Sequence, residues 1–169
     1  MVIIGIDPST VATGWCIMDD EKLTAYGEIK CNREWTTGRK MRTIFTGLSD
    51  VISKHRPSVM VCEKQFQGKF ASAVMAVSQV RGVVELVADV NGIEVVTIAP
   101  AHHKKMFVGT GKATKKMSVA KAQEIYHINT KSNNVADAIS LAYTYRITGG
   151  AANGDIQGYG RTKTKPRRT

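Results

Sequence analysis

Acidic residues are scarce in this chain, and the resulting imbalance of charge is its most informative compositional feature. Fourteen Asp and Glu face 24 Lys and Arg, which leaves a formal net charge of +10 at pH 7 over 169 residues. Such an excess favours a polyanionic partner, and nucleic acid is the commonest one. A small basic protein whose surface charge serves no purpose would show the same balance, so charge alone does not decide the question.

Cysteines and long apolar runs are scarce too. The three cysteines, Cys16, Cys31 and Cys62, are odd in number and widely spaced, which fits neither a disulfide framework nor a zinc site. A reducing cytosol is the simplest setting for them. No apolar run approaches the roughly 20 residues of a membrane-spanning helix, and the N-terminus lacks the features of a signal peptide. We therefore expect an intracellular protein without a membrane segment.

The order of the predicted elements indicates an α/β protein. Short β-branched runs predict strands, and apolar residues three and four apart predict helices. The strands are expected at residues 2–7, 13–19, 24–29, 59–63 and 93–98, and the helices at 37–55, 72–90, 115–126 and 134–147. A meander followed by alternating units gives a mixed sheet with helices on both faces. Residues 1–148 are predicted to form one domain, and the Gly-rich, then basic segment 149–169 a flexible tail.

Three acidic residues stand alone at the ends of predicted elements. Asp7 ends the first strand, Glu63 ends the fourth, and Asp137 lies in the first turn of the last helix. Converging carboxylates repel one another unless cations balance them, and Mg²⁺ prefers oxygen ligands. Two such ions about 3.5–4 Å apart can activate a water and stabilise the leaving oxygen of a phosphodiester. Taken singly, each acid could instead cap a turn, end an exposed strand or serve the helix N-terminus.

Several sequence blocks, in the same order along the chain, resemble the RuvC family of the RNase H-like superfamily, in a phage-like branch. They are GIDPSTVATGW at the N-terminus, VCEKQF around Glu63, QVRGVVELVA with its Arg81-Gly82 pair, and NNVADAIS near the end. The strongest is PAHHKKMFVGTGKATKK, from Pro100 to Lys116, which is similar to the family signature P-x-x-x-K…V-G-x-G-x-A-x-K. The resemblance covers nearly the whole folded length.

The resemblance implies a fold and an activity. The fold is an RNase H-like mixed five-stranded sheet, an antiparallel meander of three strands plus two parallel strands, with helices on both faces. The activity is that of a structure-selective endonuclease that resolves Holliday junctions, and other branched DNA, by two-metal hydrolysis. Two Mg²⁺ per active site are expected, with Mn²⁺ as a substitute and no nucleotide cofactor. A cytoplasmic homodimer in a bacterial or phage-infected cell is implied, and a twofold enzyme suits a near-twofold junction.

The resemblance also assigns roles to residues. It implies Asp7, Glu63 and Asp137 as metal ligands, and Lys104 and Lys115 beside the scissile phosphate, where an ammonium neutralises developing charge. Phe66 is expected on a loop, stacked on an unpaired base at the crossover; a place in the core is the alternative. Further DNA contacts are expected from Lys64, Lys69, Arg81, Lys105, Lys112 and Lys116, and from the basic tail between Arg161 and Arg168.

Position 134 departs from the family pattern. The last helix of the family presents an acid or a His three residues before its final Asp, and here that position is Asn134. An Asn oxygen can coordinate Mg²⁺ without bringing charge, so Asn134 is a candidate fourth ligand. Weaker binding of one metal, natural variation and an engineered inactivating substitution all stay open. The alternative function is a RuvC-like protein that binds junctions without cutting them.

Two other enzyme classes share part of the pattern. Sugar kinases and actin-like ATPases begin with a similar strand and turn, but they need a second phosphate loop and a longer, two-lobed chain, neither of which is present here. Other RNase H-like nucleases act on RNA–DNA hybrids or flaps. The lysine signature after Pro100 favours the resolvase branch over these nucleases.

Overall fold

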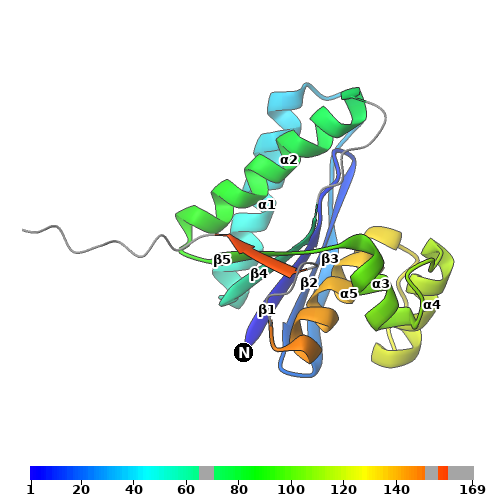
Figure 1. The fold of residues 1–169 in the computed structure, drawn as a ribbon. Coiled ribbons are helices and arrows are strands. Elements are labelled where there is room, and N and C mark those ends of the chain that lie inside the picture. Colours follow the sequence, from blue (N-terminus) through cyan, green and yellow to red (C-terminus); the bar gives the residue numbers. More distant parts are fainter. Residues whose placement is uncertain (65–70, 151–155, 160–169) are drawn as a thin grey trace, which may run out of the picture.

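A mixed sheet forms the centre of the computed structural model, which describes residues 1–64, 71–150 and 156–159, except the side chains of 71–73 and 157–159 (Figure 1). The strands are β1 (Val2–Asp7), β2 (Ala12–Asp19), β3 (Lys22–Lys30), β4 (Val59–Glu63), β5 (Glu94–Ile98) and β6 (Ile156–Tyr159), in the spatial order β3-β2-β1-β4-β5-β6. The helices are α1 (Thr37–His55), α2 (Ala71–Val90), α3 (Pro100–Val108), α4 (Lys115–Tyr126) and α5 (Asn133–Thr148).

The pairing of the strands confirms the predicted five-stranded sheet. β1 pairs with β2 and β2 with β3 in antiparallel fashion, whereas β4 is parallel to both β1 and β5. β6 adds a sixth strand, antiparallel to β5, with Ile156 buried opposite Ile98. This strand lies in the segment for which the sequence predicts a flexible tail. The rest of that tail, 151–155 and 160–169, lies outside the described residues.

Helices cover both faces of the sheet, as the sequence predicts. Along β1, Ile4 and Ile6 pack in the core beneath α1 and α2, whereas Ile3 belongs to the core beneath α5. This division follows from the alternation of side chains along a strand. α4 packs on α5, and α3 contacts both of them. Buried residues occur on nearly every face of α5, so α5 is the central helix of its layer.

Two glycines let α5 lie directly on the sheet. A Cβ at Gly5 of β1 would collide with the carbonyl oxygen of Ala138, and one at Gly14 of β2 would collide with the backbone of Asn134. In both cases the added Cβ would meet the backbone of α5, which has little freedom to move away. The absence of these side chains therefore fixes how closely the N-terminal half of α5 approaches β1 and β2.

α3 is a helix that the sequence analysis did not anticipate. Pro100 was interpreted only as the end of the preceding strand, but proline is also favoured in the first turn of a helix, where its missing N–H costs nothing. Here Pro100 begins α3, and Gly109, with φ of 93°, ends it. His103 and Phe107, four residues apart, form its buried face. The helix brings the first lysines of the family signature onto a rigid element.

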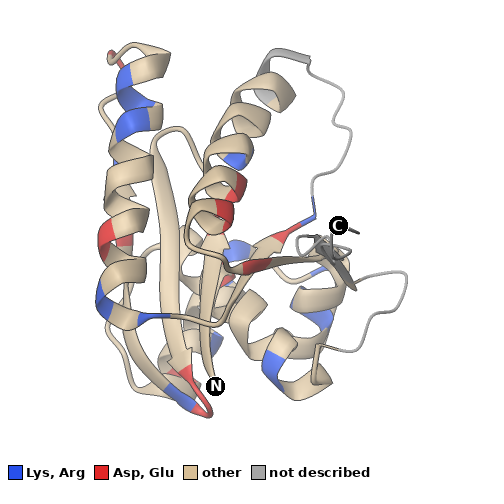
Figure 2. Ribbon diagram, turned by 90° about the vertical axis from the view of Figure 1, so that its left-hand side faces the viewer, with Lys and Arg blue, Asp and Glu red and all other residues tan. Residues whose placement is uncertain are grey.

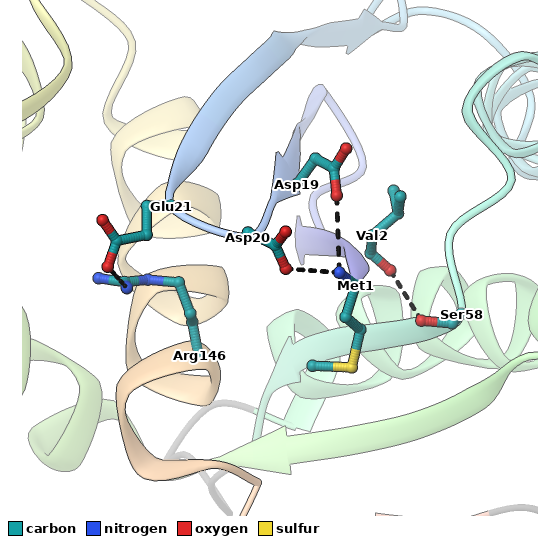
Figure 3. Close-up of polar contacts among 7 residues, drawn as sticks. All are labelled: Met1, Val2, Asp19, Asp20, Glu21, Ser58 and Arg146. Atoms are coloured by element: carbon teal, nitrogen blue, oxygen red, sulfur yellow. Dashed lines mark hydrogen bonds and ion pairs between the residues drawn. The ribbon is translucent and has the colours of Figure 1, made fainter.

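Ion pairs hold together the edge of the sheet where β1 begins (Figure 3). The N-terminal ammonium of Met1 lies 2.6 Å from the carboxylate of Asp20, in the turn between β2 and β3. Arg146 of α5 reaches Glu21 of the same turn at 2.9 Å. These contacts tie the meander to α5 at one end, and the carboxyl ends of β1 and β4 lie at the other. Within the described ranges, no helix is both long and apolar enough to cross a bilayer.

Candidate active site

The three predicted carboxylates meet where β1 and β4 end. These neighbouring strands are parallel, with Ile6 opposite Cys62, so Asp7 and Glu63 emerge at the same edge of the sheet. α5 crosses that edge close to the strands, because Gly5 and Gly14 leave room for it. Its first turns bring Asp137 to the same place. The fold therefore brings Asp7, Glu63 and Asp137 together at one edge of the sheet, as expected from the sequence.

Burial and mutual repulsion act on Asp7 most strongly. Burial, followed by the charges of Asp137 and Glu63, raises the pKa of Asp7 to about 8, against the opposing effect of Lys115 and Lys104. The other four residues that the resemblance assigns to catalysis are thus all within electrostatic reach of Asp7. A carboxyl group so perturbed gains from any cation that enters the site.

Asp137 carries a second sign of an incomplete site. Burial, and to a lesser extent Glu63, raises its pKa, whereas His103, Lys104 and Lys115 lower it. Its Oδ1 atom is buried and has no hydrogen-bond partner among the described residues. Such an atom costs about 1–3 kcal/mol if nothing satisfies it. A hard divalent ion would satisfy this oxygen, and the carboxylate donor set suits Mg²⁺.

The described residues do not form a ready-made protein cage for such an ion. No group of three or more His, Cys, Asp or Glu side chains among them is disposed to hold one metal. This arrangement is compatible with Mg²⁺, which usually keeps several waters and is bound by one or two carboxylates together with phosphate oxygens of the substrate. The site fits an ion shared between protein, water and DNA.

Asn134 lies at the margin of the site and makes a contact of its own. Its amide nitrogen donates to the carbonyl oxygen of Ala12 at 2.6 Å, and its backbone packs on Gly14, which is paired with Asp7. The side chain thereby links the start of α5 to the start of β2. The other amide atom, Oδ1, takes no part in this bond. Coordination of a metal by Asn134 stays a prediction.

Several lysines of the family signature lie around the carboxylates. Lys104 is half-buried on α3, and Lys115 begins α4 directly after its N-cap residue Thr114. Gly111 packs against the start of α3, which folds the intervening loop back and keeps α4 near α3. The other predicted DNA contacts on these elements, Lys105, Lys112 and Lys116, are exposed to solvent.

The remaining predicted DNA contacts have mixed positions. Lys64 is half-buried directly after β4. Arg81 of α2 donates to the carbonyl oxygen of Glu63 at 3.0 Å and pairs with Glu85 at 2.8 Å, so it supports the end of β4. Phe66, Lys69 and the basic tail lie outside the described residues.

His103 is part of the site that the sequence analysis missed. It is fully buried, with Nε2 3.6 Å from the Oε1 atom of Glu63 and Nδ1 2.8 Å from the hydroxyl of Ser140. A carboxylate neighbour favours a proton on Nε2. The Ser140 hydroxyl would then donate to Nδ1, a shorter contact than the 3.2 Å to the carbonyl oxygen of His103. The four-residue spacing to Phe107 was the available signal that this histidine faces inward.

Comparison with known proteins identifies relatives over nearly the whole chain. The family model described as crossover junction endodeoxyribonuclease RuvC matches residues 3–145. The RuvC protein of Dictyoglomus thermophilum is 30% identical over 151 residues, which are 86% of this chain and 96% of the relative. That of Parvibaculum lavamentivorans is 32% identical over 156 residues, which are 89% of each.

Solved structures of similar fold agree with these relatives. T. thermophilus RuvC in complex with a Holliday junction substrate has a TM-score of 0.80 at 22% identity, covering 88% of this chain and 94% of that one. Fowlpox virus resolvase with its substrate Holliday junction DNA has a TM-score of 0.58 at 17% identity, covering 88% and 98%. These likenesses establish the fold. Since the family model matches residues 3–145, from β1 into α5, the chain belongs to the RuvC family of crossover junction endodeoxyribonucleases.

Proposed function

We propose that this chain cuts Holliday junctions, and other branched DNA, as a Mg²⁺-dependent endonuclease in the cytoplasm of a bacterial or phage-infected cell, without a nucleotide cofactor. The observation that carries the proposal is the meeting of Asp7, Glu63 and Asp137 at one edge of the sheet, within electrostatic reach of Lys104 and Lys115. Carboxylates alone would repel a phosphodiester, so the site works only when cations are present. Family membership makes junction DNA the substrate to test first.

Each side chain has a task in hydrolysis. Asp7, Glu63 and Asp137 would hold two Mg²⁺ ions, for which Mn²⁺ substitutes, and Asn134 offers an amide oxygen as a fourth ligand. Bound ions supply a positive charge that activates water and stabilises the leaving oxygen. Lys104 and Lys115 bind the oxygens of the scissile phosphate and stabilise the charge that develops on it. The attacking water forms a new bond to phosphorus as one ester P–O bond breaks.

A homodimer is supported by an exposed apolar stripe on α2. Among the exposed large apolar side chains of the described residues, four lie on this one helix: Met75, Val77, Leu86 and Val90. Met75, Leu86 and Val90 follow one face together with Gly82, beside which there is open space. A second copy of the chain, packed through the same face, would bury this stripe. Two sites on opposite sides of the dimer could then cut two strands of one junction.

Cleavage of a synthetic mobile four-way junction tests the proposal. We expect the chain to cut it in Mg²⁺ and Asp7→Asn to bind it without cutting, because binding rests on lysines and phosphates rather than on the carboxylates. Asp50→Asn, at an exposed position of α1, is the matched control and should cut normally. Equal cleavage by the parent chain and by Asp7→Asn would remove Asp7 from the catalytic set.

A non-cleaving, junction-binding protein is the second candidate, and Asn134 is the observation that favours it. On that alternative the parent chain binds junctions in Mg²⁺ without cutting, and Asn134→Asp restores cutting. If the parent chain cuts and Asn134→Asp does not cut faster, the amide is part of a working site.

A further inference from the structure

The N-terminal part of α1 and the turn before it carry a group of arginines that the active site does not use. Arg33, Arg39 and Arg42 are all exposed, and no carboxylate in the described residues pairs with any of them. Figure 2 shows the Lys and Arg of α1 gathered at its two ends, with an acidic position between them. We call Arg33, Arg39 and Arg42 the α1 arginine patch.

Local structure holds this patch in place. The guanidinium of Arg39 lies 4.2 Å above the centre of the Trp35 ring, a cation–π contact that orients it. Lys40 donates to the carbonyl oxygen of Arg33 at 2.8 Å and so fixes the turn. Apart from the adjoining backbone of α1, no described residue lies within 4 Å of the position that a Cβ would take at Gly38. Together with Arg39 and Arg42, Gly38 lines a surface hollow of about 320 Å³. Arg39 and Arg42 therefore flank an open concave surface, and no carboxylate of the described residues neutralises them.

The patch lies at the same edge of the sheet as the carboxylates, on the other side from the lysines. Lys30, which ends β3, is paired with Ala12 of β2. The backbone N–H of Cys31 donates to the carbonyl oxygen of Val11, in the loop that follows Asp7. β3 lies two strands from β1, which is about 10 Å. Lys104 and Lys115 instead come from α3 and α4, in the layer of α5. Positive charge thus lies on both sides of the catalytic edge.

We propose that the α1 arginine patch binds the phosphate backbone of a duplex arm leaving the junction, opposite the side held by the lysines of α3 and α4. This inference rests on the proposed function for the identity of the substrate. Arginine suits the role because its planar fork binds phosphate oxygens in pairs. The exposed position and the hollow between Arg39 and Arg42 match a backbone that passes along the surface rather than a base that enters a pocket.

Salt dependence of binding gives the first test. The double variant Arg39→Gln/Arg42→Gln should bind a four-way junction more weakly in the absence of divalent ions. The slope of log K against log salt concentration should be smaller by about 2, because each lost phosphate contact lowers it by about 0.9. The control, Lys22→Gln/Lys54→Gln, removes the same charge from exposed positions at the opposite edge. It should leave the slope unchanged, and both variants should keep the parent's melting temperature.

Neutral methylphosphonate linkages, placed one at a time along each arm, give the second test. The patch predicts positions in one arm where a neutral linkage weakens binding by the parent chain but not by the double variant. The proposal is overturned if no linkage position behaves in this way and the double variant has the same salt slope as the parent chain. The proposal is also overturned if the parent chain sediments as a dimer and the double variant as a monomer. The arginines would then contact the second copy of the chain rather than DNA.

The two levels of inference fail in different ways. If the parent chain neither prefers nor cuts junctions, the proposed function fails. The patch is then judged by the salt slope on linear duplex, where a difference between the double variant and its control still supports phosphate binding. If junctions are cut but the slopes of parent, variant and control agree, only the patch is refuted.

Discussion

Replacement of Asp7 by Asn should stabilise the protein in the absence of metal while it abolishes cutting. Burial and the neighbouring carboxylates raise the pKa of Asp7 to about 8 in the folded chain, against an ordinary value of 3.8. Between these values the folded state binds a proton that the unfolded state has released, so stability falls as the pH rises from about 4 to about 8. Asn cannot ionise, and therefore it carries no such penalty.

The size of the effect follows from the same two values. One pKa unit corresponds to about 1.4 kcal/mol, and pH 7 lies about three units above the unfolded value, which sets an upper limit of roughly 4 kcal/mol. Water and small movements at the open edge of the site reduce this, so we expect a gain of about 1–4 kcal/mol in the free energy of unfolding. Mg²⁺ should reverse the order, because it stabilises only a folded state whose carboxylates can bind it.

Urea unfolding at several pH values, with a chelator and with Mg²⁺, measures both effects. The stability advantage of Asp7→Asn over the parent chain should grow from pH 4 to pH 8 in chelator and change sign when enough Mg²⁺ is added. Asp50→Asn, at an exposed position, should follow the parent throughout. A less stable Asp7→Asn in chelator, or a pH dependence equal to the parent's, would refute the view that these carboxylates are held together under repulsion.

Three further predictions concern the surroundings of the carboxylates. Gly5→Ala should lower stability by about 1–3 kcal/mol in urea unfolding, because the new methyl group meets the backbone of α5, whereas Gly38→Ala, in open space, should not. His103→Leu should raise the Mg²⁺ concentration for half-maximal cleavage, because it removes the polar nitrogen 3.6 Å from Glu63. His103→Gln, which keeps a polar side chain at this position, should raise it less; equal shifts would argue for a packing role alone. Phe66→Ala should slow cleavage of an intact junction more than of one with unpaired bases at the cut, since a stacked base contributes about 1–3 kcal/mol; lower melting temperature with equal loss on both substrates would place Phe66 in the core.

Elements with a strong local pattern could be predicted from the sequence. The bounds of α1 and α4 agree with the expected helices, because apolar spacing and cap residues define both ends locally. β1 and β4 could likewise be recognised as buried runs that end in an acid. The meeting of Asp7 and Glu63 then follows from parallel pairing, which needs only the order of the elements.

Features that depend on distant partners could not be predicted in this way. β6 is a four-residue strand whose formation depends on the free edge of β5. The support that Arg81 gives to Glu63 joins residues 18 apart, and the contact of His103 with Ser140 joins residues 37 apart. Nothing in the local sequence distinguishes Arg81 from an exposed cation, and the spacing of His103 to Phe107 indicates burial without indicating the partner. The case of α3 is different, because Pro100 was a local signal but a proline fits the end of a strand and the first turn of a helix equally well.

Asn134 shows why its replacement must be interpreted together with its hydrogen bond. In the structure its amide donates to the carbonyl oxygen of Ala12 at 2.6 Å. A carboxylate at the same place has no proton to donate, so two oxygens would face each other and the start of α5 would lose its link to β2. Asn134→Asp therefore adds a charged ligand and removes a structural contact at once. Faster cutting by that variant would mean that the added charge outweighs the lost bond. Slower cutting with lower stability would mean that this chain has adapted its helix packing to the amide, and that the amide belongs to the native design of the site.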